Sequence, residues 1–205
     1  DANNGMKLDA VTSEQKEIGI KWQLFDDRLM LSSALFDISK TGTLITEQLD
    51  NPVGNIETIT TQAGEQRHKG FELSAQGAAT DRLFVMASTM YIDAEYVQGN
   101  ARPTDTPKWS ASLWTRYELN DAIAFNAGAF YEGERFANSN NTITQDAYTR
   151  VDIGATYKFN INNTDINLRL NVKNLFDTNY LAGGGTNNVT VGEGTNLRLA
   201  AQFSF

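Results

Sequence analysis

The sequence predicts an all-β fold, an antiparallel up-and-down transmembrane β-barrel to which the chain contributes about nine strands. Three observations predict it. Apolar and polar residues alternate almost from end to end, which is the period of a β-strand with two different faces. The joins between the alternating segments are short and long in turn, as in transmembrane barrels. Aromatic residues gather near strand ends on the apolar face, where such barrels meet the membrane interface.

Composition limits the classes of function. The 205 residues carry 17 Lys and Arg against 25 Asp and Glu, a formal net charge of −8, which repels nucleic acid. The chain has no cysteine, so a disulfide framework, a thiolate metal site and a reactive-cysteine enzyme are excluded. His68 is the only histidine, and His-based catalysis would therefore depend on one residue. The sequence has no run of about 18 apolar residues, so we expect no transmembrane helix.

The predicted strands differ in how cleanly they alternate. In chain order, alternation is weak over 17–24 and clear over 108–119, 150–159, 166–173 and 196–205. Side chains of successive strand residues point to opposite faces. The clearest strand thus places Ile166, Leu168, Leu170 and Val172 on one face and Asn167, Arg169, Asn171 and Lys173 on the other.

The connections alternate in length. Short ones made of turn-forming residues lie at 26–27, 80–81, 120–121 and 160–165. Long ones, rich in Asn, Thr and Gly, cover 43–66, 98–107, 136–147 and 177–195. Because outer-membrane barrels have periplasmic short turns and external long loops, we expect extracellular long loops and a periplasmic C-terminus. An odd number of strands that starts in an external loop does not make a whole barrel, so we expect a part of a longer one.

Periodicity alone does not say whether the apolar face meets lipid or a soluble core. Aromatic residues near strand ends favour a membrane interface; they are Trp22, Tyr117, Tyr157, Phe159, Phe203 and Phe205. Small residues occupy the same face at Ala111, Ala127, Ala129, Ala155 and Ala201, where a soluble core would be filled by larger side chains. The membrane interpretation is favoured, and a soluble antiparallel β binding module stays as the alternative.

Several segments resemble TonB-dependent siderophore receptors. LDAVTSEQKEIGIK at 8–21, LMLSSALFDISK at 29–40 and GEQRHKGFEL at 64–73 are similar to barrel strands of that family, and Thr106-Pro107-Lys108 is similar to a strand opening. The most specific match is NVKNLFDTNY at 171–180. The terminal Phe205 resembles the C-terminal aromatic residue that outer-membrane barrels present to the barrel-assembly machinery. One departure is Gly192-Glu193-Gly194-Thr195, where the family often carries Gly-x-Pro-Arg.

The resemblance implies an outer-membrane receptor for TonB-dependent uptake of ferric siderophores, with the TonB-ExbB-ExbD complex acting through an N-terminal part. Residues 1–205 would be the last portion of a barrel of about 22 strands, in contact with outer-membrane lipid. We expect the plug domain and TonB box to be absent from this chain, which would not transport alone. No enzyme activity, cofactor or bound metal is expected, since the iron would arrive within its chelator. A passive porin-like outer-membrane barrel is a second alternative.

Two groups of residues are candidates for the site. Charged side chains on the polar face are predicted to face the water-filled lumen and the plug, because each would cost about 2–4 kcal/mol at mid-membrane on the lipid face; they are Lys108, Arg116, Arg150, Asp152, Arg169 and Lys173. Their alternative role is a solvated wall. Aromatic and cationic residues on the loop side are predicted to contact the chelate: Tyr131, Arg135, Phe136, Tyr148 and Tyr180. An interface girdle is the alternative for the tyrosines.

Three other features do not indicate a site. His68 lies between Arg67 and Lys69, and a lone histidine is far more often a surface residue than a metal ligand. Gly183-Gly184-Gly185 would need a following helix to cradle a phosphate, and the sequence signals none. The carboxylates are spread over loops and lumen without a spacing that singles out a catalytic pair.

Overall fold

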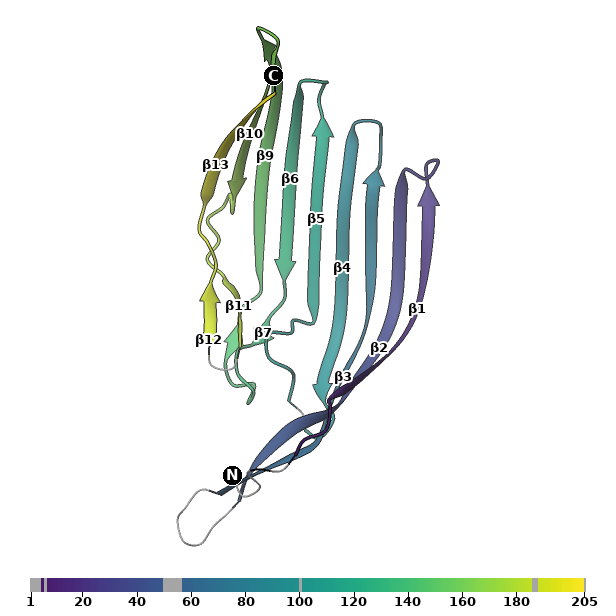
Figure 1. Cartoon of the computed structure of the whole chain (residues 1–205), viewed down its shortest axis with the longest axis vertical. Coiled ribbons are helices and arrows are strands. Elements are labelled where there is room, and N and C mark those ends of the chain that lie inside the picture. The colour runs from purple at the N-terminus through teal and green to yellow at the C-terminus, as the bar shows by residue number, and fades with distance from the viewer. Residues whose placement is uncertain (1–4, 6, 50–56, 100, 186–187, 205) are drawn as a thin grey trace.

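The computed structural model describes residues 5, 7–49, 57–99, 101–185 and 188–204. Nine of its strands form one antiparallel sheet, in which neighbours along the sheet follow one another in the chain (Figure 1). They are β1 (Thr12–Leu24), β2 (Leu29–Leu49), β3 (Glu57–Ala78), β4 (Leu83–Tyr96), β5 (Trp109–Glu118), β6 (Ile123–Glu132), β9 (Tyr148–Ile161), β10 (Thr164–Lys173) and β13 (Asn196–Ser204). The predicted all-β antiparallel fold is confirmed. Within the described ranges, no helix has the length and apolar character needed to cross a bilayer.

Short turns and long connections lie at opposite ends of the sheet, as predicted (Figure 1). The turn between β9 and β10 consists of Asn162 and Asn163, with φ values of 49° and 64°. Two successive left-handed residues make the hairpin turn whose twist matches that of the flanking strands, and asparagine tolerates this conformation better than most residues. The β9–β10 turn therefore follows directly from its sequence.

The predicted loop limits 43–66 are wrong, whereas the other long connections of the large sheet, 97–108, 133–147 and 174–195, lie close to the predicted limits. β2 continues to Leu49 and β3 begins at Glu57, because both segments are rich in the β-branched residues Thr and Ile, which favour strands. Smaller hairpins also form within the connections: β7 (Arg135–Phe136) with β8 (Thr144–Gln145), and β11 (Leu181–Gly185) with β12 (Asn188–Val191).

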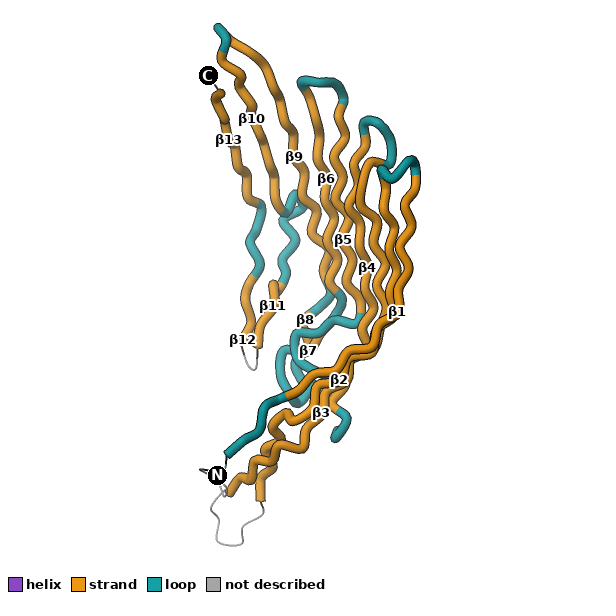
Figure 2. Tube along the Cα trace, turned by 45° about the vertical axis from the view of Figure 1, so that its right-hand side comes forward, coloured by secondary structure: helices purple, strands orange, loops and turns teal. Residues whose placement is uncertain are grey.

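The β2–β3 hairpin extends beyond the other strands and bends away from them (Figure 2). Its pairing register shifts between Thr41 and Thr43 and again between Thr43 and Ile45. Such irregularities increase local twist and bend a strand. The bend begins where the neighbouring strands end. Thr12, the first residue of β1, pairs with Thr41, and Tyr96, the last residue of β4, pairs with Gln66.

The register aligns the apolar faces of neighbouring strands into continuous rows. One row joins Ile18, Leu35, Phe71, Tyr91 and Trp109, and another joins Tyr117, Phe125, Ala155, Leu170 and Leu199. Ile18 is 73% exposed and Leu199 is 70% exposed, so the apolar rows do not pack into a sealed core in the described part of the chain. A soluble sheet would bury such rows, whereas a membrane barrel presents them to lipid.

Aromatic side chains mark both ends of the apolar face. At the loop end, Phe71, Tyr91 and Trp109 contact one another with ring centroids 5.0 to 5.8 Å apart. At the turn end, Tyr157 stacks on Phe159 at 5.0 Å. Aromatic belts at two levels are typical of membrane barrels. The predicted contribution of Phe205 lies outside the described residues.

The strands are staggered along the sheet. A single row of paired residues joins Leu24, at the turn end of β1, to Leu197, near the loop end of β13. β13 then continues to Ser204. From each strand to the next, the turn end is therefore displaced along the strand direction by about one residue. With ~3.3 Å per residue and ~4.8 Å between strands, this displacement corresponds to a strand tilt of about 35°. This is the tilt of strands in a closed barrel.

Asn174 fixes the connection between β10 and β13. Its side chain is fully buried, and its amide donates to the carbonyls of Thr178 at 2.9 Å and Glu193 at 3.0 Å. The Asn174 side-chain oxygen accepts from the Thr178 N–H at 2.9 Å. Asp177 accepts from the Thr195 N–H at 2.9 Å. The Asn-Leu-Phe-Asp segment therefore holds the start of the last loop against its end.

We predict that Asn174→Ala in the full receptor lowers the free energy of unfolding by about 1–3 kcal/mol, because it removes a fully buried side chain and its hydrogen bonds to the backbone of Thr178 and Glu193. Asn179→Ala is the matched control, since Asn179 is an exposed residue of the same loop. The measurement is urea unfolding of both variants in detergent. Equal midpoints for the two variants would show that the Asn174 hydrogen bonds do not stabilise the barrel.

Candidate functional site

The polar face opposite the apolar rows carries charges that are compensated by neighbours. Arg150 makes two hydrogen bonds of 3.1 Å to Asp152 and lies 4.6 Å from the centroid of the Phe130 ring. Asp152 also accepts from the backbone N–H of Asn174 at 2.8 Å. Arg169 donates to the side chain of Gln202 at 2.6 Å. These pairs make a hydrated, hydrogen-bonded wall instead of a row of free charges.

The other predicted lumen residues lie on this wall or at its rim. Arg116 lies 3.3 Å from Glu118, and Lys173 lies 3.0 Å from Glu193. The hydrogen bond from Lys173 holds the pKa of the Glu193 carboxyl below its usual range. Lys108 precedes β5, and its ammonium lies 3.9 Å from a carboxylate oxygen of Asp93, which belongs to the face of the apolar rows. Lys108 therefore lies at the loop-end rim, and its charge is directed to the outer face and not to the polar wall.

A hollow of about 440 Å³ interrupts the polar wall. Two glycines create it: a Cβ at Gly128 would come within 3.0 Å of the Phe130 ring, and a Cβ at Gly154 within 2.8 Å of the Asn171 side-chain oxygen. The buried side-chain oxygen of Asn126, which lines the hollow, has no hydrogen-bond partner in the described residues. A buried acceptor of this kind requires water or a bound polar group.

Arg135 is the centre of the loop-end cluster. Its side chain is 4% exposed and lies 2.6 Å from Asp105. It also donates to the carbonyl oxygen of Leu181 at 2.6 Å, and Asp105 accepts from the N–H of Gly184 at 3.2 Å. The guanidinium therefore joins three connections: the segment before β5, the β7–β8 hairpin and the β11–β12 hairpin. A bidentate cation of this type is suited to fixing several oxygen acceptors at once.

Two tyrosines complete the cluster. Tyr148 stacks on Tyr180 with ring centroids 4.3 Å apart, and the guanidinium of Arg135 lies 5.9 Å from the Tyr148 ring centroid. Tyr180 packs over Gly192, where a Cβ would come within 2.3 Å of the ring. Glycine at this position is therefore required for the tyrosine pair to form.

Gln145 belongs to the cluster although sequence reasoning did not identify it. It pairs with Arg135 in the β7–β8 hairpin and is 1% exposed. Both polar atoms of its amide, and one terminal nitrogen of Arg135, are buried without a hydrogen-bond partner in the described chain. Unpaired buried donors and acceptors cost free energy until water or a ligand meets them. No local pattern around Gln145 signals this role.

The structure separates the predicted ligand residues into two sets. Arg135, Tyr148 and Tyr180 come together, and Phe136 is next to them through its carbonyl oxygen, which accepts from the Asp105 N–H at 2.8 Å. Tyr131 pairs with Ala111 and Thr149 in the apolar rows, on the opposite face from the cluster. Its position favours the girdle alternative.

The remaining features lie away from the cluster. His68 is in β3, paired with Ile38 and Ala94, and the described residues contain no group of three His, Cys, Asp or Glu that could hold a metal ion. Gly184 and Gly185 pair with β12, so the glycine run continues as a hairpin and not as a helix.

Comparisons with known proteins agree with this architecture. The family model described as TonB dependent receptor-like, beta-barrel matches residues 1–175. The chain is 31% identical over its whole length to the probable TonB-dependent siderophore receptor PiuA of Acinetobacter baumannii, of which it spans 28%. It is 30% identical, over 82% of its length, to the ferrichrome outer membrane transporter/phage receptor of Escherichia coli, of which it spans 23%.

A solved structure shows the same fold. The crystal structure of the siderophore receptor PiuA from Acinetobacter baumannii matches 98% of this chain and 29% of its own, with a TM-score of 0.82 and 30% identity. The chain spans less than a third of the length of these relatives. Its register, its exposed apolar face and the family match lead to one conclusion: the chain belongs to the TonB-dependent receptor family and forms part of the β-barrel of an outer-membrane protein.

Proposed function

We propose that the chain is part of the barrel of an outer-membrane transporter for ferric siderophores, and that its loop-end cluster contacts the chelate. The observation that carries the proposal is the union of Arg135 with the stacked pair Tyr148 and Tyr180. This arrangement combines a cation with flat aromatic surfaces, which are the groups that hold an anionic or aromatic ligand. The siderophore names of the related receptors support the same substrate class.

Binding in this site needs no iron ligand from the protein. A siderophore occupies the coordination positions of its iron, so the receptor recognises the outer surface of the chelate. Arg135 places its positive charge beside the Tyr148 ring. The buried, unpaired nitrogen of Arg135 and the buried amide of Gln145 would gain partners when the cluster opens to admit a polar group of the chelate. The proposed role is therefore that of a receptor and not an enzyme, with the iron chelate as cargo.

The polar wall is proposed to face a plug domain. In this arrangement the compensated pairs, such as Arg150 with Asp152, present hydrogen-bonding surface without a large net charge. The hollow with the unpaired Asn126 oxygen would receive a polar group of the plug. The energised TonB-ExbB-ExbD complex would then open the path by acting on the N-terminal part.

The proposed orientation places the long connections outside the cell and the short turns in the periplasm. The alternation of short and long connections supports it. The apolar rows would then contact outer-membrane lipid, as their exposure requires.

The direct test is growth of a deletion strain on iron-poor medium supplemented with single siderophores. We expect growth to fail on the cognate siderophore and to be restored by the full gene, but not in a strain without TonB. Transport through a passive barrel would continue without TonB. Wild-type growth of the deletion strain on every siderophore would count against this function.

The assignment of the cluster is tested by a matched pair of tyrosines at the same height on opposite faces. We expect Tyr148→Leu in the full receptor to weaken siderophore binding by about tenfold, because it removes the stacked ring beside Arg135. Tyr131→Leu should leave the affinity unchanged, since Tyr131 pairs with Thr149 on the apolar face. Binding is measured by titrating the ferric siderophore against protein fluorescence. Equal losses in both variants would refute the cluster.

A further inference from the structure

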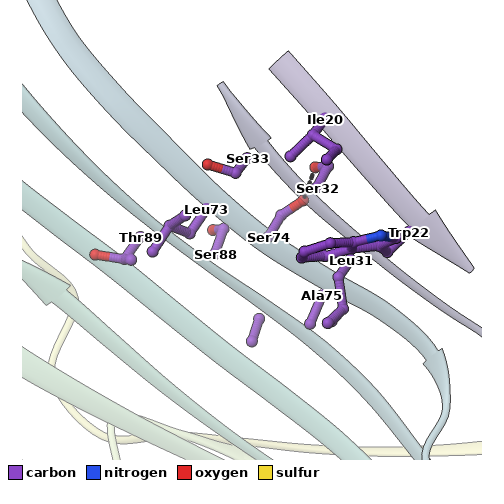
Figure 3. A pocket seen from close by; sticks show the side chains of 11 residues that line it. Ile20, Trp22, Leu31, Ser32, Ser33, Leu73, Ser74, Ala75, Ser88 and Thr89 are labelled. Atoms are coloured by element: carbon purple, nitrogen blue, oxygen red, sulfur yellow. Dashed lines mark hydrogen bonds between the residues drawn. The ribbon is translucent and has the colours of Figure 1, made fainter. Parts of the chain in front are cut away.

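An apolar groove crosses the outer face of the first four strands. It has a volume of about 480 Å³. Its larger side chains are Ile20, Trp22, Leu31 and Leu73, with the small Ala75 beside them (Figure 3). Ala87 also lines the groove. The register explains this shape, since one row runs from Trp22 and Leu31 to the two alanines. The groove is therefore a gap in the apolar rows caused by small side chains between large ones.

A charged row lies above the groove, on the loop side. Lys16, Asp37, Lys69 and Asp93 pair in sequence across β1 to β4, on the same face as the groove. Lys16 and Ile20 are four residues apart on β1, or about 13 Å along the strand. The aromatic trio Phe71, Tyr91 and Trp109 lies between the two levels. This order of apolar groove, aromatic belt and charges is the order of acyl chain, interface and headgroup in a membrane.

The carboxylates of this row are already paired. Asp37 accepts two hydrogen bonds from Arg67, at 2.9 and 2.6 Å, and Asp93 lies 3.9 Å from Lys108. Lys69 makes no ion pair with any described residue. Lys16 pairs with Glu14 at 3.2 Å, but both side chains are more than 70% exposed, and such pairs are weak. The row therefore offers two ammonium groups to an anion.

We propose that this face binds one outer-leaflet lipid, with an acyl chain in the groove and a phosphorylated headgroup on Lys69 and Lys16. A flexible hydrocarbon chain fills an irregular apolar groove. A polar ligand would find few free partners there, because the hydroxyls of Ser32, Ser74, Ser88 and Thr89, which also line the groove, already have hydrogen-bond partners. The ~13 Å from the charged row to Ile20 lies within the ~15 Å of hydrocarbon in one leaflet, so one lipid can reach both. The inference rests on the proposed orientation, in which the loop end faces outward.

The test uses the full-length receptor, freed of lipid in mild detergent and titrated with diphosphoryl lipid A, with bound lipid counted by native mass spectrometry. Lys69→Gln removes a headgroup contact, and Ala75→Leu fills part of the groove. The control is Ala155→Leu, the same substitution on the same face, in a row with Phe125 and Leu170. We expect each test variant to weaken lipid binding at least about tenfold, and the control to bind as the wild type does.

Dephosphorylated lipid A should bind the wild type as weakly as diphosphoryl lipid A binds Lys69→Gln. Equal binding of the two lipids, or equal loss in Ala75→Leu and Ala155→Leu, would overturn the proposal. A change of oligomeric state in Ala75→Leu without a change in lipid binding would assign the groove to a second copy of the protein instead. Siderophore uptake, measured in the same strains, separates the lipid site from the proposed transport function. Uptake without specific lipid binding would overturn only the lipid site. Absence of uptake in the wild type would overturn the transport function.

Discussion

The constraint on which this structure depends is that backbone N–H and C=O groups find no partner in hydrocarbon. Within the described sheet, the seven inner strands meet it by pairing on both edges, and β1 and β13 pair on one edge each. Because side chains alternate along a strand, the register of this pairing also decides which side chains meet lipid and which meet water. A slip of one residue between β9 and β10 would move Arg169 from the polar wall into the apolar rows. The strand pairing that satisfies the backbone groups therefore also keeps the apolar and the polar side chains on separate faces.

The functional groups occupy the places where this constraint is relaxed. On the polar wall, water permits charge, and pairs such as Arg150 with Asp152 keep the charge local. At the loop end, the backbone is free to leave the sheet, and small hairpins bring distant residues together. Arg135 and Asp105 are 30 residues apart and meet at 2.6 Å. The loop-end cluster around Arg135 thus forms where side-chain hydrogen bonds, and not backbone pairing between strands, hold the connections together.

Most of the sheet could be predicted from the sequence, because apolar and polar residues alternate with a period of two along the strands and turn-forming residues separate them. The faces of 166–173 and the Asn162-Asn163 turn follow from local rules. The loop limits were missed because strand propensity extends β2 and β3 past the membrane pattern. Tyr131 and Tyr148 both lie at the loop ends of their strands, and strand parity puts them on opposite faces. Gln145 gave no signal, since its burial depends on connections distant in the sequence.

The order of the strands has a kinetic consequence. Each strand of the large sheet pairs only with its neighbours in chain order, and the small hairpins lie within the connections. Every pairing therefore closes a short stretch of chain, and the entropy lost at each closure is modest. Such a sheet grows by successive addition of hairpins to an existing edge, without any strand waiting for a distant partner.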